Sequence, residues 1–272
     1  MKSRLLVAAV GVPLLFYIVL GAPPIVMMAA LCALSGVAAM ELMQCVGIAK
    51  RSFLFGWTVI CAVFSVTWYY DRPEYMEVLW FLYVLVTFFF AIYKAGEIKL
   101  VHILAGLFAV IAIPYSFSAF IRMEDAGIPR VCLLLPFIFS FLSDTGGYFG
   151  GRFFGKHKLA PKVSPKKTVE GSIGGLAGNV LGAVIFAAVM NQWFYAGIVN
   201  SYLGMILLGL VCSVVAQIGD LSFSLIKREF GIKDYGHLFL EHGGVLDRFD
   251  SVIFCAPLIE ILVHFLPAIQ GG

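Results

Sequence analysis

Ionisable side chains gather in one polar stretch of this chain, from residue 224 to residue 250. The stretch lies between two segments that are apolar enough to span a membrane. Charge beside hydrocarbon costs free energy, so a chain that concentrates charge there generally uses it. Carboxylates bind divalent metal ions, Lys and Arg side chains bind phosphates, and this stretch offers both. Its ionisable residues include Lys227, Arg228, Lys233, Asp234, His242, Asp247, Arg248 and Asp250.

Four aspartates lie where predicted membrane spans meet the same aqueous face. Asp144 is near the end of the sixth predicted span, Asp220 is at the end of the eighth, and Asp247 and Asp250 begin the ninth. Clustered carboxylates repel one another unless a cation lies between them, and oxygen-only ligands suit Mg²⁺, which bridges to substrate phosphates. We therefore expect these four side chains to bind metal. The alternative is that each aspartate pairs with a neighbouring arginine, as Asp247 with Arg248.

A second group of polar residues follows Asp220. Ser224, Lys227 and Arg228 come three or four residues apart, so they line one face if the helix continues past residue 220. His242 precedes two glycines and could donate to a phosphate or cap the next helix. Zinc is not expected, because no HxxxH or HExxH pattern accompanies that histidine. Lys233 adds a further cation for phosphate binding.

The loop from residue 150 to residue 171 is basic and rich in glycine. Glycines let a backbone approach a ligand closely, and the lysines supply cationic donors. The Walker pattern GxxxxGK[ST] is absent, so a P-loop nucleotidase is not supported. Binding of the loop to anionic lipid headgroups is the alternative. The residues that we expect to bind phosphate here are Arg152, Lys156, Ser164, Lys166, Lys167 and Thr168.

Three ionisable residues inside apolar segments remain ambiguous. Glu41 lies in the second predicted span, and an acid within a membrane is a candidate for function. Glu260 and His264 are one helical turn apart, so pairing between them is the simpler interpretation. The six cysteines have no metal-ligand spacing and lie in or beside apolar spans, which predicts small buried side chains.

The composition identifies an integral membrane protein. Of 272 residues, 61% are hydrophobic and 13% are charged, against roughly 25% charged in soluble domains. The net charge of +3 is small and gives no reason to expect a nucleic acid partner. A spanning helix needs about 20 apolar residues, which predicts an all-α polytopic protein with about nine transmembrane helices. Their approximate limits are 4–20, 24–45, 53–70, 77–93, 100–121, 130–149, 172–190, 203–220 and 251–267.

The distribution of Lys and Arg predicts the orientation. With the N-terminus in the cytoplasm and nine crossings, 16 of the 19 basic residues fall on the inside. Only Arg72, Arg122 and Arg130 fall outside. We therefore expect a multi-pass protein of the cell (inner or plasma) membrane, with its active site at the cytoplasmic leaflet.

The chemistry is confined to the C-terminal half. Residues 1–125 are expected to pack, to form a lipid-facing cavity and to make dimer contacts, and residues 126–272 to form a catalytic domain with two cytoplasmic loops, 150–171 and 221–250. A stripe of small residues from Gly171 to Gly182 permits close helix contact, either within the chain or across a homodimer. Without a strong internal repeat, a transporter with inverted repeats is not supported.

The charged segment resembles the signature of the phosphatidate cytidylyltransferases, also called CDP-diacylglycerol synthases. The resemblance is dense over residues 140–255, and only length and hydropathy agree over the first five spans. Family members often have Pro-Gly before His-Gly-Gly, where this chain has Leu240-Glu241. The matching residues are Ser224, Lys227-Arg228, Lys233-Asp234, Gly236, His242-Gly243-Gly244, Asp247-Arg248 and Asp250, with Asp144, Gly155-Lys156, Leu159-Ala160-Pro161, Ser164-Pro165-Lys166-Lys167-Thr168 and Glu170-Gly171 upstream.

The resemblance implies the reaction of CTP with phosphatidate to give CDP-diacylglycerol and pyrophosphate, in phospholipid biosynthesis. It implies Mg²⁺, with a second divalent or monovalent cation as an option. Asp220 and Asp247 would hold the catalytic metal, and Asp144 and Asp250 would hold a second ion or shape the surroundings of the first. The residues expected to act in catalysis are Lys227, Arg228, Asp247 and Arg248, beside the substrate-binding residues Arg152, Lys156, Ser164, Lys166, Lys167, Thr168, Ser224, Lys233 and His242.

Two other functions remain open at this point. A CTP-dependent polyprenol or phytol kinase would transfer the γ-phosphate and release CDP. A transporter would place charged residues through the middle of the bilayer, whereas here the charge lies at one face.

Overall fold

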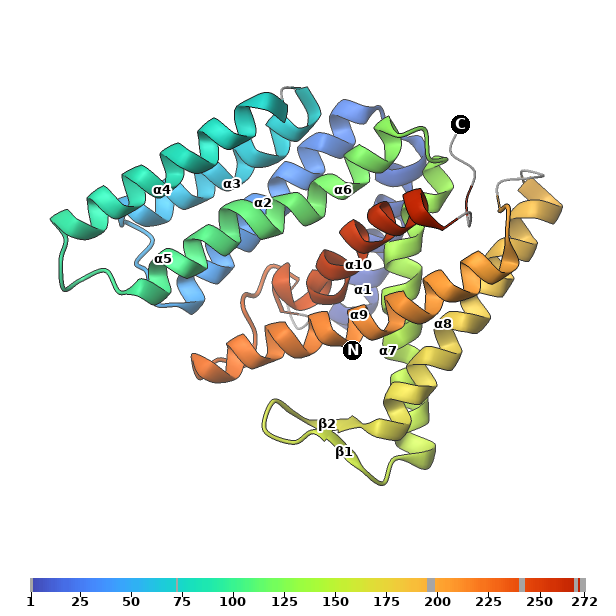
Figure 1. Cartoon of the computed structure of the whole chain (residues 1–272). Helices are drawn as coiled ribbons and strands as arrows, with labels where there is room; N and C mark the ends of the chain where they lie inside the picture. The colour runs from blue at the N-terminus through green and yellow to red at the C-terminus, as the bar shows by residue number, and fades with distance from the viewer. Residues whose placement is uncertain (1, 72, 195–198, 240–242, 267–268, 270–272) are drawn as a thin grey trace. The chain divides into compact units, whose positions relative to one another are not determined.

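The computed structural model describes residues 2–71, 73–194, 199–239, 243–266 and 269, and most of them are helical (Figure 1). In this described part of the chain, each of the nine predicted spans overlaps a helix. The N-terminal elements are α1 Lys2–Phe16, the π-helical segment η1 Tyr17–Gly21, α2 Pro24–Cys45, α3 Phe53–Asp71, the short 3₁₀ turn η2 Pro73–Tyr75, α4 Met76–Tyr93, α5 Leu100–Leu107, the π-helical η3 Phe108–Ala112 and α6 Ile113–Asp125.

The C-terminal elements begin at residue 130 and include one small β-hairpin. They are the 3₁₀ turn η4 Arg130–Leu134, α7 Leu135–Phe154, β1 Lys158–Ala160, β2 Ser164–Thr168, α8 Val169–Val189, the π-helical η5 Met190–Phe194, α9 Tyr202–Glu229 and α10 Leu246–Phe265.

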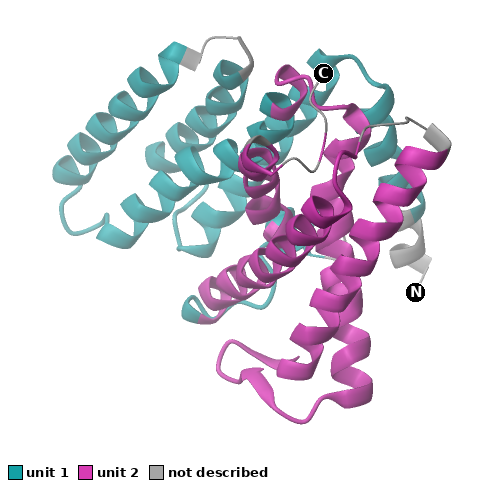
Figure 2. Cartoon of the chain, turned by 45° about the vertical axis from the view of Figure 1, so that its right-hand side comes forward, with its two compact units in different colours: residues 1–122, 229–249 teal, residues 123–228, 250–272 magenta. Residues whose placement is uncertain are grey.

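The chain divides into two compact units, shown in two colours in Figure 2. Unit 1 comprises residues 1–122 and 229–249, and unit 2 comprises residues 123–228 and 250–272. Residues 246–249 of α10 therefore belong to unit 1 and the rest of that helix to unit 2. The predicted division of labour between residues 1–125 and 126–272 concerns function and stays a prediction.

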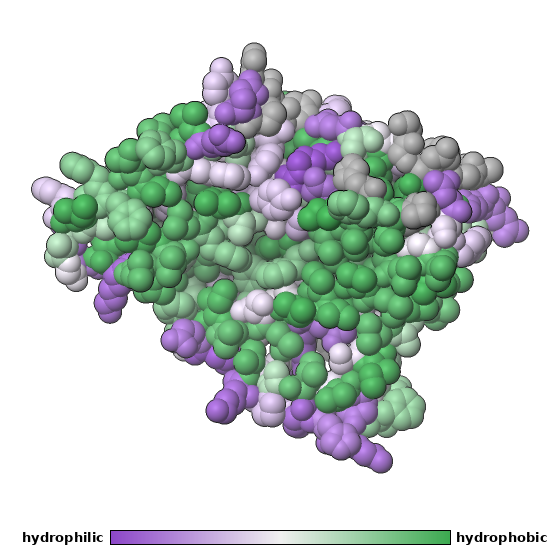
Figure 3. All heavy atoms as spheres, viewed as in Figure 1, coloured by the Kyte–Doolittle hydropathy of each residue, from purple (hydrophilic) through white to green (hydrophobic). Residues whose placement is uncertain are grey.

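Large apolar side chains cover the outer faces of the helices. Phe89, Leu181 and Leu203 are each more than 60% exposed, which would be costly in water and is normal in lipid. Figure 3 shows hydrophobic surface along the helices and hydrophilic side chains at their ends and over loops. Six helices of the described part are long and apolar enough to cross a membrane, and two shorter apolar helices accompany them. The chain is a polytopic helical membrane protein.

Helices α7 and α8 pack against each other through glycines. A Cβ atom added at Gly150 would lie 2.9 Å from the carbonyl oxygen of Glu170 and 3.1 Å from the Cα of Gly174. One added at Gly171 would lie 2.7 Å from the carbonyl oxygen of Gly147. The glycine stripe of α8 thus provides close packing within the chain, the first of its two predicted uses.

The expectation of an all-α fold was wrong for the loop 150–171. Strands β1 and β2 form an antiparallel hairpin there, with Lys158 opposite Thr168 and Ala160 opposite Ser164. The strands are too short, and too rich in Lys and Pro, to show an alternating pattern in the sequence. Thr168 ends the hairpin and caps α8, because its Oγ1 accepts the backbone N–H of Gly171 at 3.1 Å.

The predicted loop 221–250 is also shorter in the structure, since α9 continues to Glu229 and α10 begins at Leu246. The helix therefore continues past residue 220, as the prediction required, and Ser224, Lys227 and Arg228 share one face with Asp220. Hydropathy predicts where a helix leaves the membrane, not where the helix ends. Helix α9 continues beyond that point because the segment from Leu221 to Glu229 is rich in residues that also favour a helix in water.

Candidate active site

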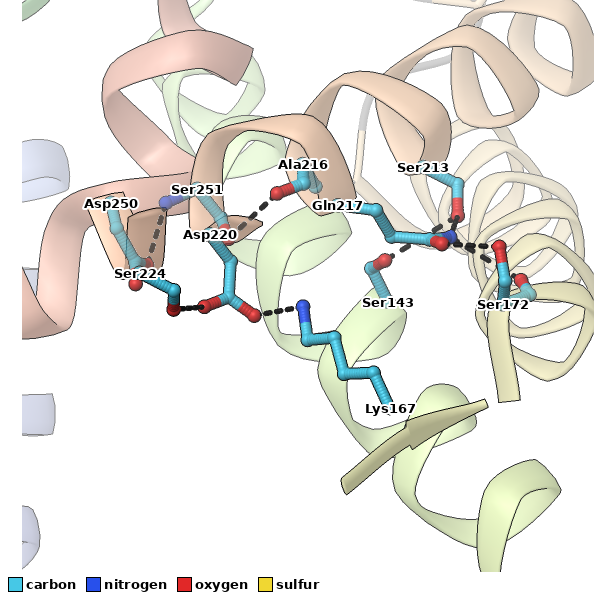
Figure 4. Close-up of polar contacts among 10 residues, drawn as sticks. All are labelled: Ser143, Lys167, Ser172, Ser213, Ala216, Gln217, Asp220, Ser224, Asp250 and Ser251. Atoms are coloured by element: carbon cyan, nitrogen blue, oxygen red, sulfur yellow. Dashed lines mark hydrogen bonds and ion pairs between the residues drawn. The ribbon is translucent and has the colours of Figure 1, made fainter. Parts of the chain in front are cut away.

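Asp220 of α9 is the centre of a polar group in unit 2 (Figure 4). Its carboxylate forms an ion pair with the ammonium group of Lys167, which extends from β2. The Oγ of Ser224, one turn further along α9, donates to Asp220 Oδ1 at 3.3 Å. The hairpin and α9 are also joined by Arg228, whose Nε donates to the carbonyl oxygen of Val163 at 3.4 Å. The basic hairpin is thus held against the helix that carries Asp220.

Helix α10 brings Asp250 close to the same group. The carboxylates of Asp220 and Asp144 lie near enough to act electrostatically on Asp250, and so does the ammonium group of Lys227. Asp250 also accepts the backbone N–H of Ser251 at 2.7 Å. Three helices, α7, α9 and α10, therefore each contribute a carboxylate to one region of unit 2.

Close packing of α9 on α10 fixes the spacing of these acids. A Cβ atom at Gly219 would lie 2.7 Å from the carbonyl oxygen of Asp250, so no larger residue fits without movement. The Oγ of Ser251 donates to the carbonyl oxygen of Ala216 at 3.0 Å, which ties the two helices together. Gly219 and Ser251, the chain neighbours of Asp220 and Asp250, thus determine the distance between the two carboxylates.

These oxygen donors fit a hard cation in chemical type. Among the described residues, however, no three Asp, Glu, His or Cys side chains are close enough together to hold a metal ion. In this arrangement Lys167 supplies the positive charge beside Asp220. A bound cation and Lys167 would therefore share the carboxylate of Asp220 or compete for it.

A cavity of about 220 Å³ opens beside the hairpin, entirely within unit 2. Lys166, Lys167, Thr168 and Asp144, all predicted site residues, line it. Its remaining polar lining comes from four residues that the sequence reasoning did not single out, Ser143, Tyr148, Ser172 and Gln217.

The other basic residues of the hairpin region lie at its surface. Arg152 is exposed and donates from Nη1 to the hydroxyl of Tyr148 at 2.8 Å. The backbone N–H of Lys156 donates to Glu170 Oε2 at 3.0 Å, and His157 Nδ1 lies 2.6 Å from Glu170 Oε1. Glu170 thus holds the first residues of the hairpin in place, a role that sequence reasoning missed.

Asp247 lies in unit 1 and holds the loop before α10. Its Oδ2 accepts the backbone N–H groups of Tyr235 at 2.7 Å and of Gly244 at 3.0 Å. Gly243 has φ of 82°, a left-handed conformation that favours glycine, and a Cβ there would lie 2.7 Å from Asp247 Oδ2. Gly243 and Gly244 therefore allow the chain to fold tightly around this carboxylate.

Glu41, ambiguous in the sequence, has a defined structural position in unit 1. The side chain is only 6% exposed, and its two oxygens accept the backbone N–H groups of Val245 and Leu246, each at 2.9 Å. Gly236 and Gly244 pack directly against it. The carboxylate thus caps the N-terminus of α10, where the helix dipole favours negative charge. Its position in an otherwise apolar span was the only signal in the sequence.

The predicted site residues therefore fall into two groups. Lys233, Asp247 and Arg248 lie in unit 1, and His242 lies outside the described residues. The side chain of His264 is likewise outside them, so its pairing with Glu260 stays a prediction. All six cysteines are free, and all except Cys45 are buried, as predicted. The residues that belong to unit 2 are Asp144, Arg152, Lys156, Ser164, Lys166, Lys167, Thr168, Asp220, Ser224, Lys227, Arg228 and Asp250.

Comparisons with known proteins identify relatives of this chain. Three relatives named phosphatidate cytidylyltransferase share segments of the chain. The protein from Synechocystis sp. is 45% identical over 75 residues, which are 28% of this chain and 24% of the relative. The protein from Staphylococcus haemolyticus is 48% identical over 59 residues, which are 22% of this chain and 23% of the relative. The protein from Staphylococcus aureus is 43% identical over 74 residues, which are 27% of this chain and 25% of the relative.

These alignments are local, so the chain spans about a quarter of the length of the curated relatives it matches. A sequence model described as the cytidylyltransferase family matches much more, residues 2–266. Because this match covers nearly the whole sequence, both units included, the chain belongs to the cytidylyltransferase family.

Proposed function

We propose that this protein is a phosphatidate cytidylyltransferase, which joins the cytidylyl group of CTP to phosphatidate and releases pyrophosphate. The observation that carries the proposal is the convergence of Asp144, Asp220 and Asp250 beside Lys167 and a basic hairpin. Carboxylates near lysines suit a cation-assisted reaction between two phosphates. The names of the relatives and the family support the same reaction.

The proposed reaction requires few catalytic groups from the protein. The second pKa of a phosphomonoester is about 6, so the phosphate of phosphatidate is already ionised at neutral pH. One of its oxygens attacks the α-phosphorus of CTP, the new P–O bond forms, and the bond to the pyrophosphate leaving group breaks. No general base and no covalent enzyme intermediate are needed. The residues position the two substrates and neutralise charge.

Each group of residues then has a role in the proposal. Lys166 and Lys167, at the cavity, would bind the triphosphate of CTP. Lys227, on the face of α9 that carries Asp220, would neutralise charge on the lipid phosphate. The binding and catalytic roles of the remaining predicted residues stay as proposed from the sequence: Arg152, Lys156, Ser164, Thr168, Ser224, Arg228, Lys233, His242, Asp247 and Arg248.

The carboxylates Asp144, Asp220 and Asp250 are proposed to hold Mg²⁺, because their oxygens are the ligands that this ion prefers. Since no three such side chains of the described residues lie close enough together for this, they would have to move toward the ion when it binds. When bound, the ion would neutralise charge on the phosphate oxygens. The role of Asp247 as a metal ligand stays the expectation that the resemblance implies. A second cation, divalent or monovalent, remains part of the proposal.

We also propose nine membrane crossings with the N-terminus and the active site on the cytoplasmic side of the cell membrane. A cysteine introduced at Lys162, which is exposed at the hairpin, tests this orientation. The native cysteines are largely buried, so they give little background. An impermeant maleimide should label the new thiol only in inside-out vesicles. Labelling in right-side-out vesicles would reverse the topology. Crosslinking in membranes tests the expected homodimer.

The activity is tested with purified protein in detergent, phosphatidate, Mg²⁺ and each nucleoside triphosphate in turn. We expect CTP alone to give a lipid whose mass matches CDP-diacylglycerol, with one pyrophosphate released per lipid formed. A lipid that gains a single phosphate, with CDP released, would make the protein a kinase. Folded protein that turns over no nucleotide would contradict the proposal.

A further inference from the structure

The cavity beside the hairpin has a charged end and a neutral end. Lys167 lies at the charged end, Lys166 and Asp144 are the other charged lining residues, and Ser143, Ser172 and Gln217 supply neutral polar groups. Figure 4 shows this order, from Asp220 and Lys167 through Ser143 to Gln217 and Ser172. We infer that the neutral end is a nucleobase subsite that recognises the exocyclic amino group of cytosine. The inference deepens the proposed function and rests on it.

The hydrogen bonds at the neutral end have a defined direction. The hydroxyl of Ser172 donates to Gln217 Oε1. Both hydrogens of the Gln217 amide are also used, because Nε2 donates to the carbonyl oxygen of Ser172 and to Ser213 Oγ, each at 3.3 Å. A serine hydroxyl has one donor hydrogen and two acceptor lone pairs, and an amide has two donor hydrogens. What remains for a ligand at Ser172 and Gln217 is acceptor capacity.

This polarity distinguishes the two pyrimidines. Position 4 of cytosine carries an amino group, which donates, whereas position 4 of uracil carries a carbonyl oxygen, which accepts. An amino group facing Ser172 Oγ and Gln217 Oε1 would be satisfied, and a carbonyl oxygen would meet only other acceptors. A buried polar group left without a partner costs more than a typical hydrogen bond gains. Sites built to bind an N–H group therefore reject analogues that lack it.

Ser143 can complete the recognition from α7. Its Oγ lies 3.4 Å from Ser213 Oγ, which already accepts a hydrogen bond from Gln217. Ser213 can therefore donate its own proton to Ser143. The Ser143 hydroxyl then keeps a donor hydrogen for the ring nitrogen N3, which is an acceptor in cytosine and a donor in uracil.

Size and position also suit a base at this end. The cavity volume of about 220 Å³ is below the roughly 300 Å³ at which pockets for whole drug-sized ligands begin. A pyrimidine would fit inside while the triphosphate extends toward the lysines. Tyr148 lines the same cavity, is 58% exposed, and is held at its hydroxyl by Arg152. Its ring offers a face on which a base can stack.

The competing explanation is that Ser172 and Gln217 only join α8 to α9. Loss of a structural link would lower turnover with every nucleotide by the same factor. Loss of a base contact changes the ratio of kcat/KM for CTP to kcat/KM for UTP. This ratio is the readout, since it does not depend on how much protein is folded.

The experiment measures that ratio for wild-type protein, Ser172→Ala and Gln217→Met. Ser172→Ala removes one of the two acceptors, so the ratio should fall about tenfold through loss of CTP turnover. Gln217→Met releases the Ser172 proton, which can then donate to the uracil oxygen, so turnover of UTP should rise. Ser140→Ala is the matched control, because Ser140 is buried on α7 one turn from Ser143 and does not line the cavity. Its ratio should equal that of the wild type.

Each outcome separates the subsite from the function it rests on. Wild-type protein that uses CTP, with an unchanged ratio in both variants, would overturn the subsite and leave the cytidylyltransferase function intact. Equal use of CTP and UTP by the wild type would overturn it as well. Wild-type protein inactive with every nucleotide would refute the proposed function, and the subsite with it.

Discussion

Carboxylates at Glu41 in unit 1 and Asp220 in unit 2 are used in contrasting ways. Glu41 is buried, and both its oxygens accept backbone N–H groups, which cannot move away without unfolding the loop. Asp220 is partly exposed, pairs with a flexible lysine and lies near other carboxylates. A carboxylate satisfied by backbone supports the fold, whereas one held by a side chain beside like charges can exchange its partner for a ligand. Sequence position alone does not distinguish the two.

Asp220→Asn should have the largest effect on turnover. Replacing the carboxylate by an amide removes charge from the reaction centre, so kcat/KM for CTP should fall about a thousandfold. The protein should unfold at nearly the wild-type temperature. The matched control is Glu97→Gln, since Glu97 is an exposed acid that pairs with Lys94. Its kinetics should not change. Near-normal turnover in Asp220→Asn would remove this residue from the site.

Glu41→Ala should have its largest effect on stability. It leaves two buried N–H groups at the start of α10 without their acceptor, which should cost about 3 kcal/mol of unfolding free energy. Glu41→Gln keeps one acceptor oxygen and should lose less. A thiol-reactive dye can follow unfolding, because five of the six cysteines are buried. A change in the Mg²⁺ dependence of turnover without a loss of stability would contradict the structural role.

Gly146→Ala tests whether unit 2 depends on close approach of α7 and α8. The added methyl group would meet the carbonyl oxygen of Gly174, so overpacking should cost about 1–3 kcal/mol. At Gly56 of α3 a Cβ would meet nothing within 4 Å, which makes Gly56→Ala the control. That control should unfold at or above the wild-type temperature, because alanine favours helix. Equal behaviour of the two variants would argue against close packing at Gly146.

The smallest effect is expected for Lys167→Ala. Loss of this cation from the cavity should raise KM for CTP about tenfold, which corresponds to the loss of one charge-assisted hydrogen bond. The change in kcat should be smaller. Lys162→Ala removes an exposed lysine of the same hairpin that does not line the cavity. Identical KM values for the two variants would mean that the hairpin acts only through its general positive charge.

Periodicity and hydropathy predicted much of this molecule, because membrane helices obey simple rules. The apolar spans all overlap helices, and the stripe from Asp220 to Arg228 was predicted from spacing. The helix ends were missed at Phe154 and Glu229, because hydropathy reports the membrane rather than the hydrogen bonds of the helix. The β-hairpin was missed because its strands carry no alternating pattern.

The site was predictable only in part, for a different reason. Charged residues stand out in an apolar sequence, so the aspartates and lysines were found. Glu41 was not assigned, because its partners are backbone N–H groups 204 and 205 residues away. Every residue type except proline carries such a group, so no residue in the sequence marks the partner. Ser143, Ser172 and Gln217 come from three helices and resemble ordinary packing residues until the helices are assembled.

In the proposed reaction, the cytidylyl group of CTP moves to phosphatidate. This transfer is tested most directly with wild-type protein, phosphatidate and Mg²⁺ in two parallel reactions, one with CTP labelled at the α-phosphorus and one with CTP labelled at the γ-phosphorus. We expect the α-label in the lipid fraction and the γ-label in soluble pyrophosphate. A γ-label in the lipid, with the α-label in soluble CDP, would contradict the account.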